Sequence, residues 1–271
     1  MTRFRIATYN IHKGRGIDGR VRIERIARVL AEIDADIVAL QEVVSHEGLS
    51  IQDHQASYLA DRLGHFHAIG ETRKHRGGVY GNVTLSRWRL EVIRHVDLSV
   101  PGREERGVLR TDVRIGPHVL HIFNVHLGTA HRERRTQAVR LVDENLLRAI
   151  DISGPRIVLG DFNEWTHGLV TRTLSAEFHL TDLQDHVPRT RSYPAILPLL
   201  NLDHIYFDHQ LEIRKALFHR NRLSLIASDH LPLVADLIIK EPTGMRPHAE
   251  HDHQVVLPGP RPPSSRCPEW P

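Results

Sequence analysis

Residues 155–163 read Pro-Arg-Ile-Val-Leu-Gly-Asp-Phe-Asn, a short apolar run that ends in an acid, Asp161, and an amide, Asn163. Residues 36–42 follow the same plan and end at Glu42. An ionised carboxylate beside a buried strand is costly unless a counter-charge pairs with it, and a metal ion commonly provides that charge. The two runs therefore predict buried strands that place acidic side chains at a functional site.

Four further motifs place polar side chains beside apolar runs. They are Tyr9-Asn10-Ile11, Asn124-Val125-His126, Leu202-Asp203-His204-Ile205-Tyr206 and Ser228-Asp229-His230, the last after the apolar run 223–227 that is predicted as a strand. Taken singly, each motif is equally well explained as a turn or a solvated strand end. Together they supply hard oxygen ligands, amides and imidazoles, which are the groups that a magnesium phosphoesterase needs.

The composition limits the class of protein. With 271 residues, of which 40% are hydrophobic and 25% charged, the chain is long enough for a globular domain with a substantial core. Its net charge of +3 is too small to indicate a protein dominated by nucleic-acid binding. The single cysteine, Cys267, excludes an intramolecular disulfide and fits a reducing compartment.

The two ends of the chain differ in character. Residues 1–6 enter a strand pattern directly, and no apolar run can span a bilayer, so we predict a cytoplasmic monomer without a transmembrane segment. Eight of the 15 prolines lie in residues 242–271, beside three histidines. Such a segment buries too little apolar surface to order itself, although its histidines are also compatible with binding a transition metal. We predict one domain over residues 1–240 and a disordered Pro- and His-rich tail over 241–271.

The periodicity of apolar residues predicts alternating strands and helices. Strands are expected at 4–10, 36–42, 78–85, 90–98, 108–115, 119–126, 155–161 and 231–239, and helices at 23–33, 56–63 and 130–150. Turn residues between the strands from 78 to 126 indicate antiparallel pairing there. Gly64 is placed to end the second helix.

The order of the six motifs resembles that of the endonuclease/exonuclease/phosphatase superfamily, which includes deoxyribonuclease I, exonuclease III, neutral sphingomyelinases and inositol polyphosphate 5-phosphatases. The resemblance runs from Asn10 to Pro232 and is most particular to small bacterial members of unassigned substrate. Six ordered motifs are far more specific than any one of them. The resemblance implies an α/β fold, a four-layered α/β/β/α sandwich of the deoxyribonuclease I type, with its site at one rim of the paired sheets.

The resemblance also implies roles for individual residues. Glu42 matches the principal metal ligand, Asn10 its companion, and Asp229 a further acid near the metal. Asp161 and Asn163 match the pair that orients the attacking water and the scissile phosphate. The implied cofactor is Mg²⁺, with Mn²⁺ as an alternative.

Two histidines complete the implied site. His230 matches the catalytic histidine and Asp203 the acid that hydrogen-bonds it. His126 matches the second histidine of the deoxyribonuclease I and sphingomyelinase branches, and the Tyr-x-Pro-Asn motif of apurinic-site endonucleases is absent from that region. No clear acid partners His126 in the sequence, and Glu71 is the nearest candidate by position.

A competing motif lies at residues 14–19, which read Gly-Arg-Gly-Ile-Asp-Gly and match the dinucleotide-binding pattern Gly-x-Gly-x-x-Gly. Asn10 to Lys13 intervene between the apolar part of the first strand and the first glycine, so the turn is not the tight one that pattern requires, and the later acids would go unexplained. We expect instead a mobile loop at the mouth of the site, with His12, Lys13 and Arg15 facing phosphate.

Arginines offer further contacts to phosphate. Arg106, which enters a strand, is the best candidate for the substrate-facing rim. Arg132 and Arg134, at the start of a predicted helix, are better explained as solvated side chains.

The sequence thus predicts a magnesium-dependent phosphodiesterase that hydrolyses a nucleic-acid or lipid head-group phosphodiester by in-line attack of an activated water. Two alternatives stay open. One is a phosphomonoesterase acting on a small phosphate such as an inositol phosphate, which would need a basic pocket for terminal phosphates. The other is a catalytically silent nucleic-acid-binding module, which would bind with steep salt dependence and without turnover.

Overall fold

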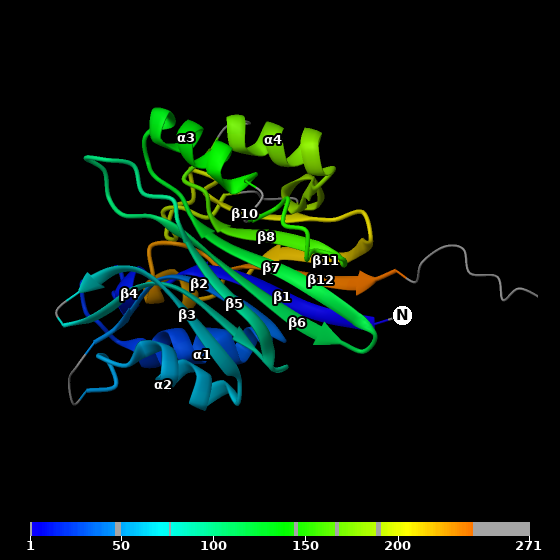
Figure 1. The fold of residues 1–271 in the computed structure, drawn as a ribbon. Coiled ribbons are helices and arrows are strands. Elements are labelled where there is room, and N and C mark those ends of the chain that lie inside the picture. Colours follow the sequence, from blue (N-terminus) through cyan, green and yellow to red (C-terminus); the bar gives the residue numbers. More distant parts are fainter. Residues whose placement is uncertain are drawn as a thin grey trace, which may run out of the picture. The chain divides into compact units, whose positions relative to one another are not determined.

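Two six-stranded sheets form the centre of the fold (Figure 1). The computed structural model describes residues 2–46, 50–75, 77–143, 146–165, 168–187 and 191–240, and the segment predicted as a tail lies outside them. The first sheet has the order β11 (Leu211–Phe218), β12 (Leu233–Ile239), β1 (Thr2–Asn10), β2 (Ile37–Ser45), β4 (Gly78–Ser86), β3 (Phe66–His75). The second has the order β5 (Leu90–Asp97), β6 (Gly107–Ile115), β7 (His118–His126), β8 (Arg156–Asp161), β10 (Asp203–Phe207), β9 (Thr181–Asp182). Both sheets are mixed, because β1 and β2, and likewise β7 and β8, run parallel.

Helices cover the outer faces of the two sheets (Figure 1). On the first sheet, α1 (Ile23–Ile33) and α2 (Gln55–Leu63) pack through a cluster that includes Leu30 and Leu40. On the second, α3 (His131–Leu141) and α4 (Leu169–Phe178) pack through a cluster that includes Phe123 and Leu174. A third cluster, with Ile6 and Ile122 among its members, fills the space between the sheets. The predicted four-layered α/β/β/α sandwich is therefore confirmed.

The alternation of side chains along the strands explains why polar groups meet at one rim. Successive residues of a strand point to opposite faces, so every second residue shares a face. Phe4 and Ile6 lie in the core between the sheets, and the same row of β1 ends at Asn10. Rows of the same kind end at His126 on β7, at Asp161 on β8 and, read backwards, at Asp203 on β10. Each apolar row thus delivers its last, polar member to the same edge.

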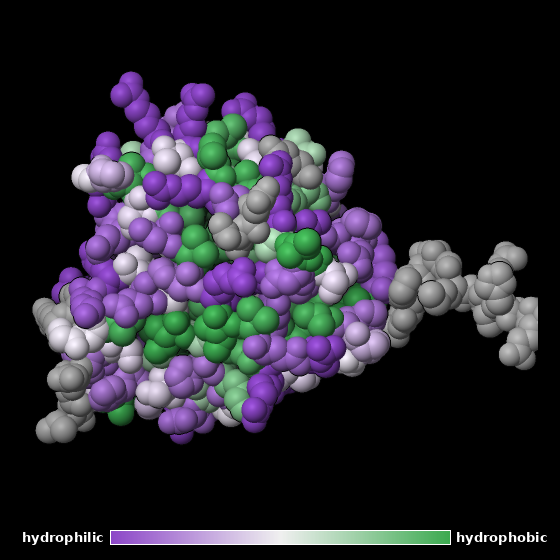
Figure 2. Space-filling view, in the orientation of Figure 1, coloured by the Kyte–Doolittle hydropathy of each residue, from purple (hydrophilic) through white to green (hydrophobic). Residues whose placement is uncertain are grey.

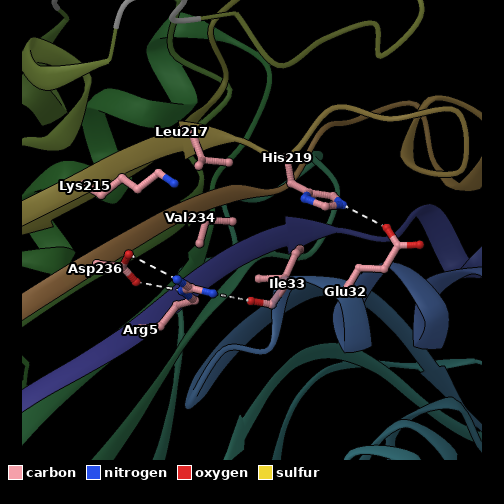
Figure 3. A pocket seen from close by; sticks show the side chains of 8 residues that line it. All are labelled: Arg5, Glu32, Ile33, Lys215, Leu217, His219, Val234 and Asp236. Carbon is pink, nitrogen blue, oxygen red and sulfur yellow. Dashed lines mark hydrogen bonds and ion pairs between the residues drawn. The ribbon is translucent and has the colours of Figure 1, made fainter.

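Hydrogen bonds and ion pairs, as well as apolar packing, hold α1 against the first sheet. In the small pocket of Figure 3, Arg5 on β1 pairs with Asp236 on β12 and also donates from Nη1 to the carbonyl of Ile33, at 2.9 Å. That carbonyl is at the C-terminal end of α1, where a cation is favourable. His219 pairs with Glu32 on the other side of the pocket. These groups satisfy one another, which indicates a structural role.

Exposed apolar residues lie where the edges of the two sheets contact each other. Figure 2 shows hydrophobic residues in a band across the middle of this face, over the region where Figure 1 places β3, β5 and β6. β3 contacts β5 there, and Phe66 and Ile93 are exposed on these strands.

The described residues contain no helix of the length and apolarity needed to cross a bilayer.

Three secondary-structure predictions need correction. The helix expected over residues 130–150 ends at Leu141, because the chain then turns. In this turn the carbonyl of Asp143 accepts a hydrogen bond from the N–H of Leu146, and Leu146 packs in the same hydrophobic cluster as Leu141. Residues 223–227 form a short helix, α5 (Ser224–Ala227), rather than a strand, since Asn221 and Ser224 hydrogen-bond each other's backbone. The strand expected to end at Glu42 continues to Ser45.

Candidate active site

Strand register places three candidate residues side by side on the second sheet. Asp161, the last residue of β8, lies opposite His126 on β7 and opposite Asp203 on β10. The approach of β7 to β8 depends on Gly160, where a Cβ atom would stand 1.9 Å from the carbonyl oxygen of Val125. Gly160 also has a φ of 144°, a conformation that favours glycine. The glycine of the Gly-Asp-Phe-Asn sequence is therefore required by packing.

Asp161 is the centre of the site. Its Oδ1 accepts a hydrogen bond from the backbone N–H of Asn163 at 2.9 Å, which fixes the carboxylate. Its Oδ2 accepts from Asn10 Nδ2 at 3.0 Å. The Nε2 atoms of His126 and His230 each lie 3.7 Å from the same Oδ2. Residues from three distant segments thus converge on one carboxylate oxygen.

His230 is held by Asp203, as the sequence predicts. The two are buried, and the ring Nδ1 lies 2.8 Å from Asp203 Oδ2. Burial disfavours a charged ring, but the carboxylates of Asp203 and Asp161 outweigh it and raise the pKa of His230 to about 10. The ring of Tyr193, which the sequence reasoning missed, packs 4.9 Å from the His230 ring. His230 is therefore an oriented imidazolium at neutral pH.

His126 has the opposite character. Burial, together with the charge of Arg106, lowers the pKa of His126 to about 4 although Asp161 is close. The acid that faces it is Asp161 and not Glu71, the candidate by position, which is exposed and acts electrostatically on His95. At neutral pH the site therefore contains one charged and one neutral histidine.

Glu42 reaches the site through a β-bulge. By strict alternation it would share the face of Leu40 and point toward the helices, but Glu42 has a φ of 56° and the register of β2 against β4 shifts there. Its Oε1 accepts from Asn10 Nδ2 at 3.3 Å, and its Oε2 lies 3.0 Å from Lys13 Nζ. Burial alone would raise the pKa of Glu42, but the charges of His126 and Lys13 lower it to about 2.

The donor set around Glu42 suits a hard divalent cation. Asn10 Nδ2 donates hydrogen bonds to the carboxylates of both Glu42 and Asp161, and the ammonium group of Lys13 contacts Glu42. These carboxylate oxygens therefore already attract groups that carry positive charge. Mg²⁺ typically needs only one or two protein carboxylates. Within the described ranges, no cluster of three or more His, Cys, Asp or Glu forms a preassembled metal centre. Asp229, the third predicted ligand, lies 3.5 Å from His12 Nδ1.

A cationic group flanks Glu42 and His126. Arg106 is buried, and its Nη2 donates to Glu104 at 2.9 Å, while its Nε and Nη1 have no hydrogen-bond partner in the part of the chain that the structure describes. Arg73 lies 4.4 Å from the ring of Tyr80, and Lys13 approaches the same ring at 5.5 Å. The sequence also indicated Arg106, Lys13 and Arg73 as basic residues suited to phosphate, but not Tyr80, whose contact with Arg73 depends on the pairing of β3 with β4.

The glycine-rich segment is not a phosphate cradle of the dinucleotide-binding kind. Its backbone amides are already used, since Gly14 donates to the carbonyl of Ile11 and Gly16 to that of Arg20. Gly16 packs so closely that a Cβ would stand 2.3 Å from the carbonyl oxygen of Ile226. Arg134, expected to be solvated, is instead buried and donates to the carbonyls of Gly128 and Thr129, so its role is structural.

The comparisons with known proteins agree with this architecture. The sequence profile of the Endonuclease/Exonuclease/phosphatase family matches residues 7–230. The chain has the phosphoesterase fold and belongs to this family, whose members are hydrolytic phosphoesterases that in general depend on a divalent metal. An uncharacterized Escherichia coli (strain K12) protein, YbhP, is 32% identical over 249 residues, which cover 86% of this chain and 96% of that protein.

Solved structures show the same fold at lower identity. An endonuclease/exonuclease/phosphatase from Bacteroides vulgatus is 18% identical, with a TM-score of 0.73 over 89% of this chain and 100% of that chain. A mannosyl-6-phosphatase from Bacteroides thetaiotaomicron is 16% identical, with a TM-score of 0.67 over 87% of this chain and 100% of that chain. The deoxyribonuclease I-like fold predicted from the motifs is thereby confirmed.

Proposed function

We propose that the protein is a magnesium-dependent phosphodiesterase, with Mn²⁺ as an alternative cofactor, that acts in the cytoplasm on a phosphodiester of the nucleic-acid or lipid type. The observation that carries this proposal is the convergence of Asn10, His126 and His230 on the single oxygen Oδ2 of Asp161. A carboxylate surrounded in this way is placed to orient a water molecule between itself and a bound phosphate.

Metal binding would fall to Glu42 and Asn10, with Asp229 nearby. When bound, the ion would neutralise the phosphate and stabilise the charge that develops on it. Glu42 suits this task because its low pKa keeps it ionised at every physiological pH. Lys13 is the competing cation on the same carboxylate, 3.0 Å away.

The protein's own residues supply the other parts of the reaction. The charged His230 donates a hydrogen bond from Nε2 and so stabilises negative charge on a phosphate oxygen. Asp203 fixes the orientation of that ring through Nδ1. The unpaired N–H groups of Arg106 suit a further phosphate oxygen, because a buried guanidinium gains most from an anionic partner. Asn163, anchored to the carbonyl of Leu127 at 2.9 Å, holds the water together with Asp161.

A phosphomonoesterase is the second candidate, and the similarity to a mannosyl-6-phosphatase favours it. The two candidates differ in the charge of their substrates, since a monoester dianion needs one more compensating group than a diester monoanion. Parallel assays with bis(p-nitrophenyl) phosphate and p-nitrophenyl phosphate in the presence of Mg²⁺ separate them. We expect a higher kcat/KM for the diester, and a clear preference for the monoester would reject the phosphodiesterase proposal.

A further inference from the structure

Three surface segments beside the site share an unusual set of exposed side chains. They are the loop 15–22, the loop 191–199 and residues 219–227, which include α5. Of the twelve large apolar residues that are exposed in the described part of the chain, six lie on these segments. They are Ile17, Val21, Ile196, Leu197, Leu199 and Ile226, and we call them the apolar collar.

The three segments touch one another and the catalytic residues. The N–H of Ile17 donates to the carbonyl of Ile226 at 3.3 Å, and Arg220 Nη2 donates to the carbonyl of Ile196 at 3.4 Å. The loop 191–199 rests on the site itself, because the N–H of Ala195 donates to the carbonyl of Asp229 at 2.7 Å. The three segments that carry the collar are therefore joined to one another and to the chain beside His230.

The charges on these segments are almost all positive. They carry six exposed arginines, namely Arg15, Arg20, Arg22, Arg191, Arg220 and Arg222. Their one aspartate, Asp18, already pairs with Arg25 at 2.7 Å. Isolated exposed apolar residues need no explanation, but several of them with arginines on segments that contact a candidate catalytic site do.

We propose that the apolar collar seats the protein on a bilayer that contains anionic phospholipids, so that the substrate is a lipid phosphodiester presented from the membrane surface. This inference rests on the proposed phosphodiesterase activity and names its substrate class. Aliphatic side chains enter the boundary between head groups and acyl chains, and flanking arginines pair with lipid phosphates. The exposed side chains of the collar are all aliphatic, whereas a surface for single-stranded nucleic acid relies on aromatic stacking.

Sedimentation with vesicles tests the seating directly. We expect the wild-type protein to bind vesicles of phosphatidylcholine with about one third phosphatidylglycerol at least about tenfold more tightly than vesicles of phosphatidylcholine alone. The double variant Leu197→Ser/Leu199→Ser should lose about tenfold or more of this affinity. Its control is Val139→Ser, an equally exposed apolar residue on α3. Arg220→Gln/Arg222→Gln should weaken binding as well, and Arg62→Gln on α2 should not.

Turnover measurements separate this inference from the proposed function. Leu197→Ser/Leu199→Ser should keep the hydrolysis of bis(p-nitrophenyl) phosphate and lose that of vesicle phospholipid, while Glu42→Gln should bind vesicles normally and hydrolyse neither. Equal vesicle binding by the collar and control variants would overturn the inference. It would also be overturned if the collar variant lost affinity for a DNA duplex instead of vesicles, or if it abolished a dimer seen by sedimentation velocity.

Discussion

His126 and His230 point their Nε2 atoms at the same oxygen, Oδ2 of Asp161, each from 3.7 Å, yet they carry different charges at neutral pH. Asp203 hydrogen-bonds His230 and favours its charged form, whereas burial, and after it the charge of Arg106, disfavours a charge on His126. The surroundings of the two histidines thus make His230 a cation and leave the ring of His126 neutral. This division is what we expect of a site that must both stabilise a phosphate and leave a neutral acceptor available.

Asp203→Asn should keep the shape of the pair and remove its charge. We expect the pKa of His230 to fall from about 10 toward its ordinary range, and turnover to fall by about two to four powers of ten. NMR titration of the ring and steady-state kinetics measure the two effects. Asp182→Asn is the matched control, because Asp182 forms the same kind of buried pair with His204, at 2.9 Å, away from the reacting groups. A normal turnover in Asp203→Asn would remove His230 from the mechanism.

His126→Ala should lower turnover by about two powers of ten, since a neutral ring beside the reacting carboxylate is lost. The presence of this histidine also leads us to expect that ordinary phosphodiesters are hydrolysed in preference to an abasic DNA duplex. Competition assays with both substrates test this. A preference for abasic DNA, together with full activity in His126→Ala, would place the protein in the apurinic-site branch instead.

Lys13→Ala should strengthen metal binding. Lys13 Nζ lies 3.0 Å from Glu42 Oε2 and repels a cation at that carboxylate, so its removal should lower the Mg²⁺ concentration for half-maximal activity by about twofold to tenfold. Activity at saturating phosphodiester as a function of Mg²⁺ gives this value. A raised Mg²⁺ requirement would show that Lys13 supports the metal rather than competing with it.

The buried His204–Asp182 pair should make stability depend on pH. Asp182 and a hydrogen bond to the Glu164 carbonyl raise the pKa of His204 in spite of its burial. The stabilisation is therefore fully present below the ordinary histidine pKa and is lost as the pH rises through the raised value. Urea unfolding of the wild type and Asp182→Asn at about pH 6 and about pH 9 should show a larger difference at the lower pH. An equal difference at both values would contradict the assignment.

The motifs at Asn10, His126, Asp161 and Asp203 predicted their part of the site because each lies at the end of a strand row, whose alternation fixes where the side chain points, whereas the motif of His230 follows the short helix α5. This is why Asp161, His126 and Asp203 lie side by side as expected. The position of Glu42 was not predictable in this way, since a bulge with a φ of 56° redirects it. The contact between Arg73 and Tyr80 depends on the register of β3 against β4, which shifts between Glu71 and Arg73, and local patterns do not specify such a shift.

The proposed boundary of the catalytic domain leads to a further expectation. Residues 242–271 are rich in proline and polar groups, and such segments contribute few packed contacts. Removal of residues 245–271 should leave the turnover number and the thermal midpoint nearly unchanged. A fall of many degrees in the midpoint would show that the catalytic domain extends further along the chain.

The hydrolysis of bis(p-nitrophenyl) phosphate by metal-stripped protein, titrated with Mg²⁺, tests the central claim most directly. We expect no turnover in excess chelator, full recovery of the wild type on addition of Mg²⁺, and no recovery of Glu42→Gln, which keeps the shape of the side chain and loses its charge. Circular dichroism should show both proteins equally folded. Undiminished hydrolysis by the wild type in excess chelator, or recovery of Glu42→Gln to wild-type turnover, would contradict a metal-dependent mechanism centred on Glu42.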